Sequence, residues 1–194
     1  FFFCFLIFVF FFYIFGGHFY AFHMKEAYVI GLDFGTDSVR ALLVDTYTGK
    51  TLATSTKFYP RWAKGYYSDP SLSQFRQHPL DYLEALREAL KEVLTSHPER
   101  KEFIRAISVD TTGSTPCLVD EHLQPLALKP EYENDPDAMF VLWKDHTAQA
   151  EAEAITAHCA KNTPNYAAYS GKHYSAEAFW AKVWHILRQN EKIR

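Results

Sequence analysis

The chain has 194 residues, a formal net charge of −3 and three cysteines. A slightly acidic chain lacks the broad basic surface with which proteins bind nucleic acid or anionic lipid, so those partners are not expected. The cysteines are few, odd in number and far apart, which fits a reducing compartment and argues against a disulfide framework or a zinc site. The length suits one ordinary domain or part of a larger one.

Residues 1–23 differ in composition from the rest of the chain. The first part reads FFFCFLIFVFFFYIF, a charge-free run that is shorter than the ~20 apolar residues of a membrane-spanning helix. It also lacks the basic start of a secretory signal. Because the first methionine is Met24, we interpret residues 1–23 as a wrongly assigned start and expect a cytoplasmic protein. A membrane anchor is the alternative, and it rests on this run alone.

From Met24 onward the pattern predicts a mixed α/β domain that begins with an antiparallel β-meander. Apolar segments joined by short turns indicate three strands, over 27–33, 39–45 and 50–58. Residues 60–78 are expected to form an ordered loop, and Pro79 suits the first turn of a helix. Its expected buried face carries leucines and a valine, namely Leu83, Leu86, Leu90 and Val93.

The second half of the chain continues with strands and helices in alternation. Strands are predicted over 103–110, 117–120 and 139–145. Thr147 is expected to cap a helix over 148–160. A last helix is predicted over 175–189, with Phe179, Val183 and Ile186 on its buried face.

A polar loop lies between the first two predicted strands. Asp33 ends the first strand, and Gly35, Thr36, Asp37 and Ser38 follow. Glycine lets a ligand approach the backbone, and successive N–H groups in a tight turn can bind an anion. Asp33 would help a polyphosphate only by holding Mg²⁺, usually through water. The loop therefore fits a site for the phosphates of a nucleotide, while an ordinary surface hairpin is the alternative. It is not a Walker-type loop, because the GxxxxGK[ST] pattern is absent from the sequence.

Four stretches together resemble one protein family. The DFGTDS hairpin is similar to the first phosphate loop of the actin, hexokinase and Hsp70-like ATPases, and within them to the FGGY carbohydrate kinases. The stretches YPRW at 59–62, DTTGSTP at 110–116 and VLWKDHTA at 141–148 resemble the L-ribulokinase branch of that family. The resemblance covers about residues 27–189. It implies an actin-like (ribonuclease H-like) ATPase fold, of which this chain would be the N-terminal part.

The resemblance also implies roles for individual residues. Asp33, with the loop of Gly35, Thr36, Asp37 and Ser38, would bind Mg²⁺ and the phosphates of ATP. The sugar pocket would be lined by Thr111, Thr112, Gly113, Ser114, Thr115, Trp143, Lys144 and Asp145. For Asp145 the sequence shows no basic partner except the adjacent Lys144, so a sugar hydroxyl is its expected donor. Arg61 and Trp62 have a weaker case, either as pocket rim or as a loop anchor.

The implied activity is ATP-dependent phosphorylation of L-ribulose in arabinose catabolism, and a homodimer is the assembly to be tested. The family's catalytic base and adenosine site would lie beyond residue 194, so residues 24–194 alone are expected to be inactive. Another sugar or pentitol kinase of the family is the first alternative, although the TTGST stretch disfavours a xylulokinase. A non-catalytic actin-like or Hsp70-like ATPase module is the second.

Overall fold

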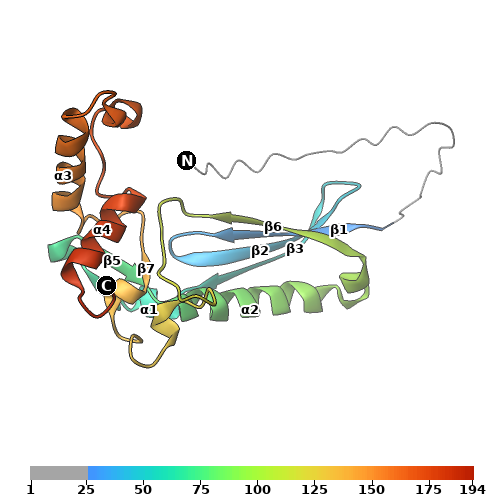
Figure 1. Cartoon of the computed structure of the whole chain (residues 1–194). Helices are drawn as coiled ribbons and strands as arrows, with labels where there is room; N and C mark the ends of the chain where they lie inside the picture. Colours follow the sequence, from blue (N-terminus) through green and yellow to red (C-terminus); the bar gives the residue numbers. More distant parts are fainter. Residues whose placement is uncertain (1–25) are drawn as a thin grey trace.

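The computed structural model of the chain describes residues 26–194 (Figure 1). The interpretation of residues 1–23 as a wrongly assigned start concerns a segment outside this range. Within 26–194, no helix combines the length and the apolar character that are needed to cross a bilayer.

The main sheet has four strands in the order β3-β2-β1-β6. Strands β1 (Tyr28–Phe34), β2 (Ser38–Asp45) and β3 (Thr51–Phe58) form the predicted antiparallel meander. Strand β6 (Ile104–Thr111) adds to β1 in parallel. Alternating side chains of β1 and β2 are buried, as expected for strands with one covered face. The α/β fold class and the opening meander are thus confirmed.

Helix α2 (Pro79–Ser96) packs against β2 and β3 and covers one face of the main sheet (Figure 1). The predicted leucine face is only partly right. The residues that lie deepest are four apart along the helix, namely Asp81, Ala85, Ala89 and Val93. Because alanine side chains are small, the helix axis can approach the sheet closely, and Leu86 and Leu90 pack beside this line. Leu83 is 47% exposed, against the prediction.

A small second sheet of β4 (Ser68–Asp69), β5 (Gln74–Gln77) and β7 (Phe140–Val141) lies beside the first. It takes strands from the segment predicted as a loop, which also contains a short helix, α1 (Pro60–Ala63). The strand predicted over 139–145 is much shorter, because the chain turns where the N–H of Asp145 donates to the carbonyl of Leu142. The strand predicted over 117–120 reduces to one isolated bridge between Val119 and Pro125.

Helices α3 (Gln149–Ala160) and α4 (Phe179–Gln189) lie at one end of the molecule, beyond the small sheet (Figure 1). Thr147 does not cap α3, since Ala148 is the N-cap residue and makes no side-chain cap. The buried residues of α4 are Ala181, Lys182 and Ile186, so the predicted burial of Phe179 is wrong. The short 3₁₀ helices are η1 (Pro70–Leu72), η2 (Pro98–Phe103), η3 (Leu126–Leu128), η4 (Pro136–Ala138) and η5 (Tyr166–Ser170).

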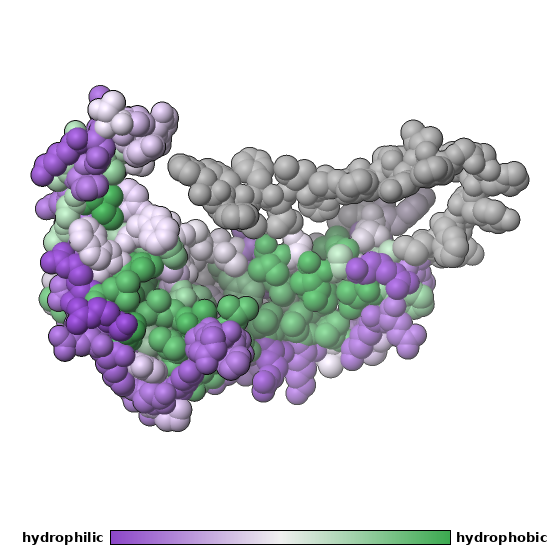
Figure 2. Space-filling model, in the orientation of Figure 1, coloured by the Kyte–Doolittle hydropathy of each residue, from purple (hydrophilic) through white to green (hydrophobic). Residues whose placement is uncertain are grey.

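Strand β6 is an edge of the main sheet among the described residues. Its side chains are exposed over most of its length, and they include the apolar Ile107 and Val109. Figure 2 shows hydrophobic surface extending across the region that β6 and α2 occupy in Figure 1.

Candidate functional site

The loop after β1 is a tight turn whose own geometry does not require glycine. The N–H of Gly35 donates to the carbonyl of Ser38 at 2.9 Å. Gly35 lies outside the left-handed region, and a Cβ there would approach only that carbonyl, at 3.5 Å. An alanine would therefore fit the empty loop. The space above Gly35 is instead what a ligand needs in order to approach the backbone closely.

Three side chains from distant parts of the chain brace this turn. Gln77 Nε2 donates to the carbonyl of Thr36 at 2.7 Å, and Trp143 Nε1 donates to Thr36 Oγ1 at 3.1 Å. Trp62 Nε1 donates to Asp37 Oδ1 at 2.6 Å. The turn is thus held from the small sheet, from the segment after β7 and from α1. These three bonds fix the position of the turn relative to three other segments of the chain.

Lys144 lies between two aromatic rings beside this turn. Its Nζ is 4.9 Å from the centroid of Trp62 and 4.6 Å from that of Phe75, within the range of cation–π attraction. Trp62 therefore contacts both Lys144 and Asp37. The structure brings Trp143 and Lys144, predicted for the sugar, next to the loop predicted for phosphate.

The predicted loop Thr111–Thr115 begins where β6 ends, beside the end of β1. In the parallel register Asp33 is paired with Asp110, and the N–H of Thr112 donates to the carbonyl of Phe34 at 3.2 Å. Both aspartates are exposed. The carboxyl ends of β1 and β6 thus present two neighbouring carboxylates and the start of the threonine-rich loop at one edge of the sheet.

An apolar cavity of about 280 Å³ lies beneath this loop. Three threonines of the loop line it together with aromatic and leucine side chains; the lining is Phe34, Tyr82, Leu83, Leu86, Thr111, Thr112, Thr115 and Phe140. The hydroxyls of Thr112 and Thr115 are 3.1 Å apart and share a hydrogen bond. A Cβ at Gly113 would have no other atom within 4 Å, and a Cβ at Gly35 would approach only the carbonyl of Ser38.

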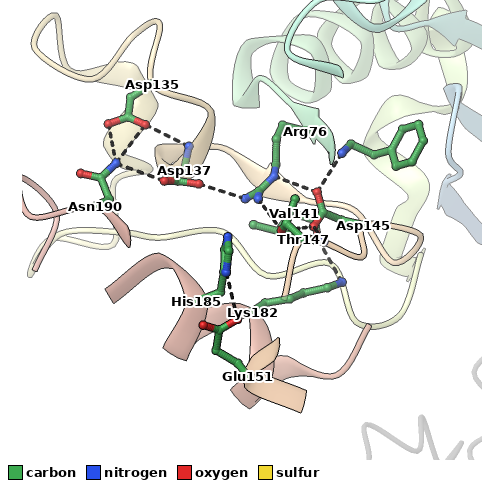
Figure 3. Close-up of polar contacts among 11 residues, drawn as sticks. Arg76, Asp135, Asp137, Val141, Asp145, Thr147, Glu151, Lys182, His185 and Asn190 are labelled. Atoms are coloured by element: carbon green, nitrogen blue, oxygen red, sulfur yellow. Dashed lines mark hydrogen bonds and ion pairs between the residues drawn. The ribbon is translucent and has the colours of Figure 1, made fainter. Parts of the chain in front are cut away.

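The prediction that Asp145 has no basic partner except Lys144 is wrong. Asp145 is fully buried, and Arg76 Nε donates to its Oδ2 at 2.9 Å in a buried ion pair (Figure 3). The Phe75 N–H also donates to Oδ2, while the N–H and hydroxyl of Thr147 donate to Oδ1. A sugar hydroxyl would have to displace one of these four donors. The residue does not end a strand, and Arg76 is the basic partner that the sequence did not reveal.

The segment that carries Trp62 is fixed by buried Asp81 of α2. Asp81 accepts hydrogen bonds from the N–H groups of Arg61 and Trp62 and from the Arg61 guanidinium. Arg61 also pairs with Glu84, and this bond lowers the pKa of the Glu84 carboxyl. Arg61 is thus a loop anchor, while Trp62 reaches the site. Gln77 and Arg76 were missed, because nothing in their local sequence distinguishes them from ordinary strand residues.

Comparison with known proteins identifies the family of this chain. Residues 28–175 match the model of the FGGY family of carbohydrate kinases, N-terminal domain. A ribulokinase of Vibrio parahaemolyticus is 50% identical over 171 residues, which are 87% of this chain and 30% of that protein. A ribulokinase of Halalkalibacterium halodurans is 34% identical over 88% of this chain and 31% of its own length. The chain therefore spans about a third of the length of these relatives.

Solved structures of low sequence identity share the fold. A xylulose kinase of Brucella ovis, 22% identical, matches 84% of this chain and 30% of its own with a TM-score of 0.65. The Plasmodium falciparum glycerol kinase with ADP, 15% identical, matches 87% of this chain and 30% of its own with a TM-score of 0.63. The architecture is therefore that of the N-terminal part of such kinases.

Proposed function

This chain belongs to the FGGY family of carbohydrate kinases, and on that premise we propose that the protein transfers the γ-phosphoryl group of ATP to a hydroxyl of L-ribulose. The convergence of Trp62, Lys144 and Asp37 is the observation that carries the proposal, because it joins a phosphate-type turn to a sugar-type segment. The ribulokinase names of the relatives supply the choice of sugar.

In this proposal the turn after β1 receives the phosphates of ATP. The space over Gly35 admits a phosphate oxygen, and the Thr36 and Ser38 hydroxyls are available donors. Asp33 is exposed at the end of β1 and holds Mg²⁺ through water, with Asp110 as its neighbour. Carboxylate oxygens are what Mg²⁺ prefers, so the donor set fits that ion. The bound metal would neutralise charge on the phosphates during transfer.

The sugar side is formed by Thr111–Thr115, Trp143 and Lys144. The threonine-rich loop offers small polar groups beside open space, and the indole offers an apolar wall. The Lys144 ammonium, held between Trp62 and Phe75, donates to sugar oxygens. Asp145 acts indirectly, because its oxygens hold Arg76 and the chain around Thr147.

We propose that residues 24–194 are part of the N-terminal domain of the protein. The proton acceptor is assigned to another part of the protein, outside these residues. The assignment rests on the family resemblance, in which none of Asp33, Asp110 and Asp145 matches the base, and Asp145 is in addition buried. The adenosine contacts are assigned outside this region as well. We also propose a cytoplasmic location for the protein. Its oligomeric state, for which a homodimer is the expectation, can be measured by light scattering.

The test is ADP formation by the complete gene product with L-ribulose, D-xylulose, glycerol or no sugar. We expect release that depends on L-ribulose, with the highest kcat/KM for that sugar. A clear preference for xylulose or a pentitol would support another sugar kinase of the family. Release that is equal with and without sugar would support an ATPase module instead.

A further inference from the structure

Lys182 of α4 is a buried lysine that is bonded only to backbone carbonyls. Its side chain is 1% exposed. Its Nζ donates to the carbonyls of Ser114 at 2.6 Å and Leu142 at 2.7 Å. It also lies 3.5 Å from the carbonyl of Val141 (Figure 3). Two of the three ammonium hydrogens thus make short bonds, and the third faces the more distant carbonyl of Val141.

These carbonyls belong to the two segments assigned to the sugar. Ser114 lies in the threonine-rich loop, and Leu142 directly precedes Trp143. The two segments are far apart in the sequence, and α4 is a third segment, distant from both. Burying an ammonium costs free energy, and an apolar side chain of similar size at position 182 would pack there at a lower cost in free energy. Lys182 therefore contributes something that an apolar residue cannot, namely a bond to both segments at once.

The backbone of Ser114 shows why this bond is needed. Ser114 has φ of 52°, in the left-handed region that residues with a Cβ rarely adopt. Such a conformation persists only where the surroundings hold it. The shortest of the Lys182 bonds is to the carbonyl of this same residue.

We propose that Lys182 is a positioning residue of the sugar site, which holds the Thr111–Thr115 loop against the segment that presents Trp143 and Lys144. The assignment of these segments to a sugar rests on the proposed function. The bond between them does not, so the two ideas can fail separately.

The charges around Lys182 make the clamp sensitive to pH. Burial lowers the pKa of the ammonium to about 8. Asp145 and Glu177 oppose this shift, and Arg76 of β5 adds to it. On proton loss the amine keeps two hydrogens, and its bonds to the carbonyls of Ser114 and Leu142 lose the charge that strengthens them. The clamp is complete below pH 8 and loosens as the pH rises through that value.

Stability follows pH with the opposite sign. The pKa of this lysine in the unfolded chain is near the ordinary 10.5. Between about 8 and 10.5 the unfolded state binds more protons than the folded state, so the contribution of Lys182 to stability rises with pH. Loosening of the clamp above pH 8 therefore cannot be explained as unfolding caused by this group.

The first test is amide hydrogen exchange of the complete gene product, compared between the wild type and Lys182→Met. Methionine keeps the length of the side chain and removes the donors. We expect exchange at least tenfold faster at the hydrogen-bonded amides within residues 112–116 and 142–146, with little change in β1 and β2. These amides are those of Thr112, Leu142, Asp145 and His146. Lys161→Met, at the exposed end of α3, is the control for lost charge. Unchanged exchange in both segments would overturn the clamp.

The second test separates the clamp from the proposed function. With the sugar that the wild type phosphorylates best, Lys182→Met should raise the KM for that sugar about tenfold and the KM for ATP less than twofold. Faster exchange with an unchanged sugar KM would overturn the positioning role. A wild type without sugar-dependent activity would refute the proposed function, while exchange would still decide on the clamp.

A wild-type measurement covers the case in which Lys182→Met does not fold. Exchange of residues 112–116 and 142–146, corrected for the intrinsic effect of pH, should accelerate from pH 7 to pH 9 while β1 and β2 stay protected. Lys182→Arg keeps its charge over this window, so it should remove the acceleration. Equal protection at both pH values in the wild type would overturn the pH sensitivity of the clamp.

Discussion

The indole N–H of Trp62 donates to Asp37 at 2.6 Å, and the same indole ring lies under the ammonium of Lys144. One side chain therefore contacts both halves of the proposed site. Its backbone N–H is in turn held by buried Asp81 of α2. The position of the turn after β1 thus depends on a tryptophan that is distant from it in sequence.

Trp62→Phe should weaken ATP binding more than sugar binding. Phenylalanine keeps a ring beneath Lys144 but cannot donate to Asp37. A hydrogen bond to a carboxylate contributes roughly 1.5–3 kcal/mol, and exposure of Asp37 reduces this to about 1 kcal/mol. We expect a KM for ATP about fivefold higher and a nearly unchanged KM for the sugar. The control is Trp184→Phe on α4. Equal kinetics of the two variants would contradict this role of Trp62.

Asp33→Ala should lower kcat on the order of 10²-fold, the scale of losing one electrostatic contact that matters mainly in the transition state. The sugar KM should change little. Titration with Mg²⁺ checks the cause, because Asp33→Asn should require more Mg²⁺ to reach its maximal rate. An unchanged kcat and an unchanged Mg²⁺ requirement would return Asp33 to an ordinary residue at the end of a strand.

His78 should make the protein less stable in mild acid. Its Nδ1 accepts the Leu80 N–H at the start of α2, which requires the neutral ring, and burial lowers the pKa of that ring below 6.5. The unfolded chain then takes up a proton near pH 6.5 that the folded chain resists. Stability is therefore complete above that pH and falls as the pH drops through the lowered pKa.

His78→Asn separates this effect from general acid sensitivity. Asparagine can cap the helix but does not titrate. The melting temperature of the variant should fall less than that of the wild type between about pH 7 and pH 5. His122 is exposed, so His122→Asn should keep the wild-type dependence. Parallel curves for wild type and His78→Asn would contradict the prediction.

The sequence predicted the parts of the fold that local pattern controls. The meander and α2 follow from alternation, turns and a proline at the start of a helix, all within a few residues of one another. The burial of α2 was harder to predict, because Ala85 and Ala89 are deepest only as a consequence of the sheet beneath them. Hydrophobicity alone predicts that the leucines of α2 are its most buried residues, and for Leu83 this prediction is wrong.

The candidate site divides in the same way. The turn at Gly35 and the segment at Trp143 could be recognised from motifs, and the structure brings them together. The partners of these residues could not be predicted, because Arg76 and Asp145 are 69 positions apart. The sequence therefore indicated which segments form the site but not which side chains support it.

The different environments of Lys144 and Asp145 lead to the last prediction. The ammonium of Lys144 is partly exposed between two rings, while the carboxylate of Asp145 is buried against Arg76. Lys144→Met should therefore raise the KM for L-ribulose tenfold or more, since a charge-assisted bond contributes roughly 1.5–3 kcal/mol. Its melting temperature should stay close to that of the wild type.

Asp145→Asn should show the opposite pattern. The amide keeps the shape but removes the charge that compensates buried Arg76, and breaking a buried pair typically costs about 3–5 kcal/mol. We expect a marked fall in melting temperature, with the KM values for ATP and sugar rising together if they change. Arg76→Met with Asp145→Leu should recover part of the stability, because the buried guanidinium and the buried carboxylate are then removed together. A sugar KM raised tenfold at unchanged stability would instead mean that Asp145 exchanges a protein donor for a sugar hydroxyl, as the sequence alone suggested.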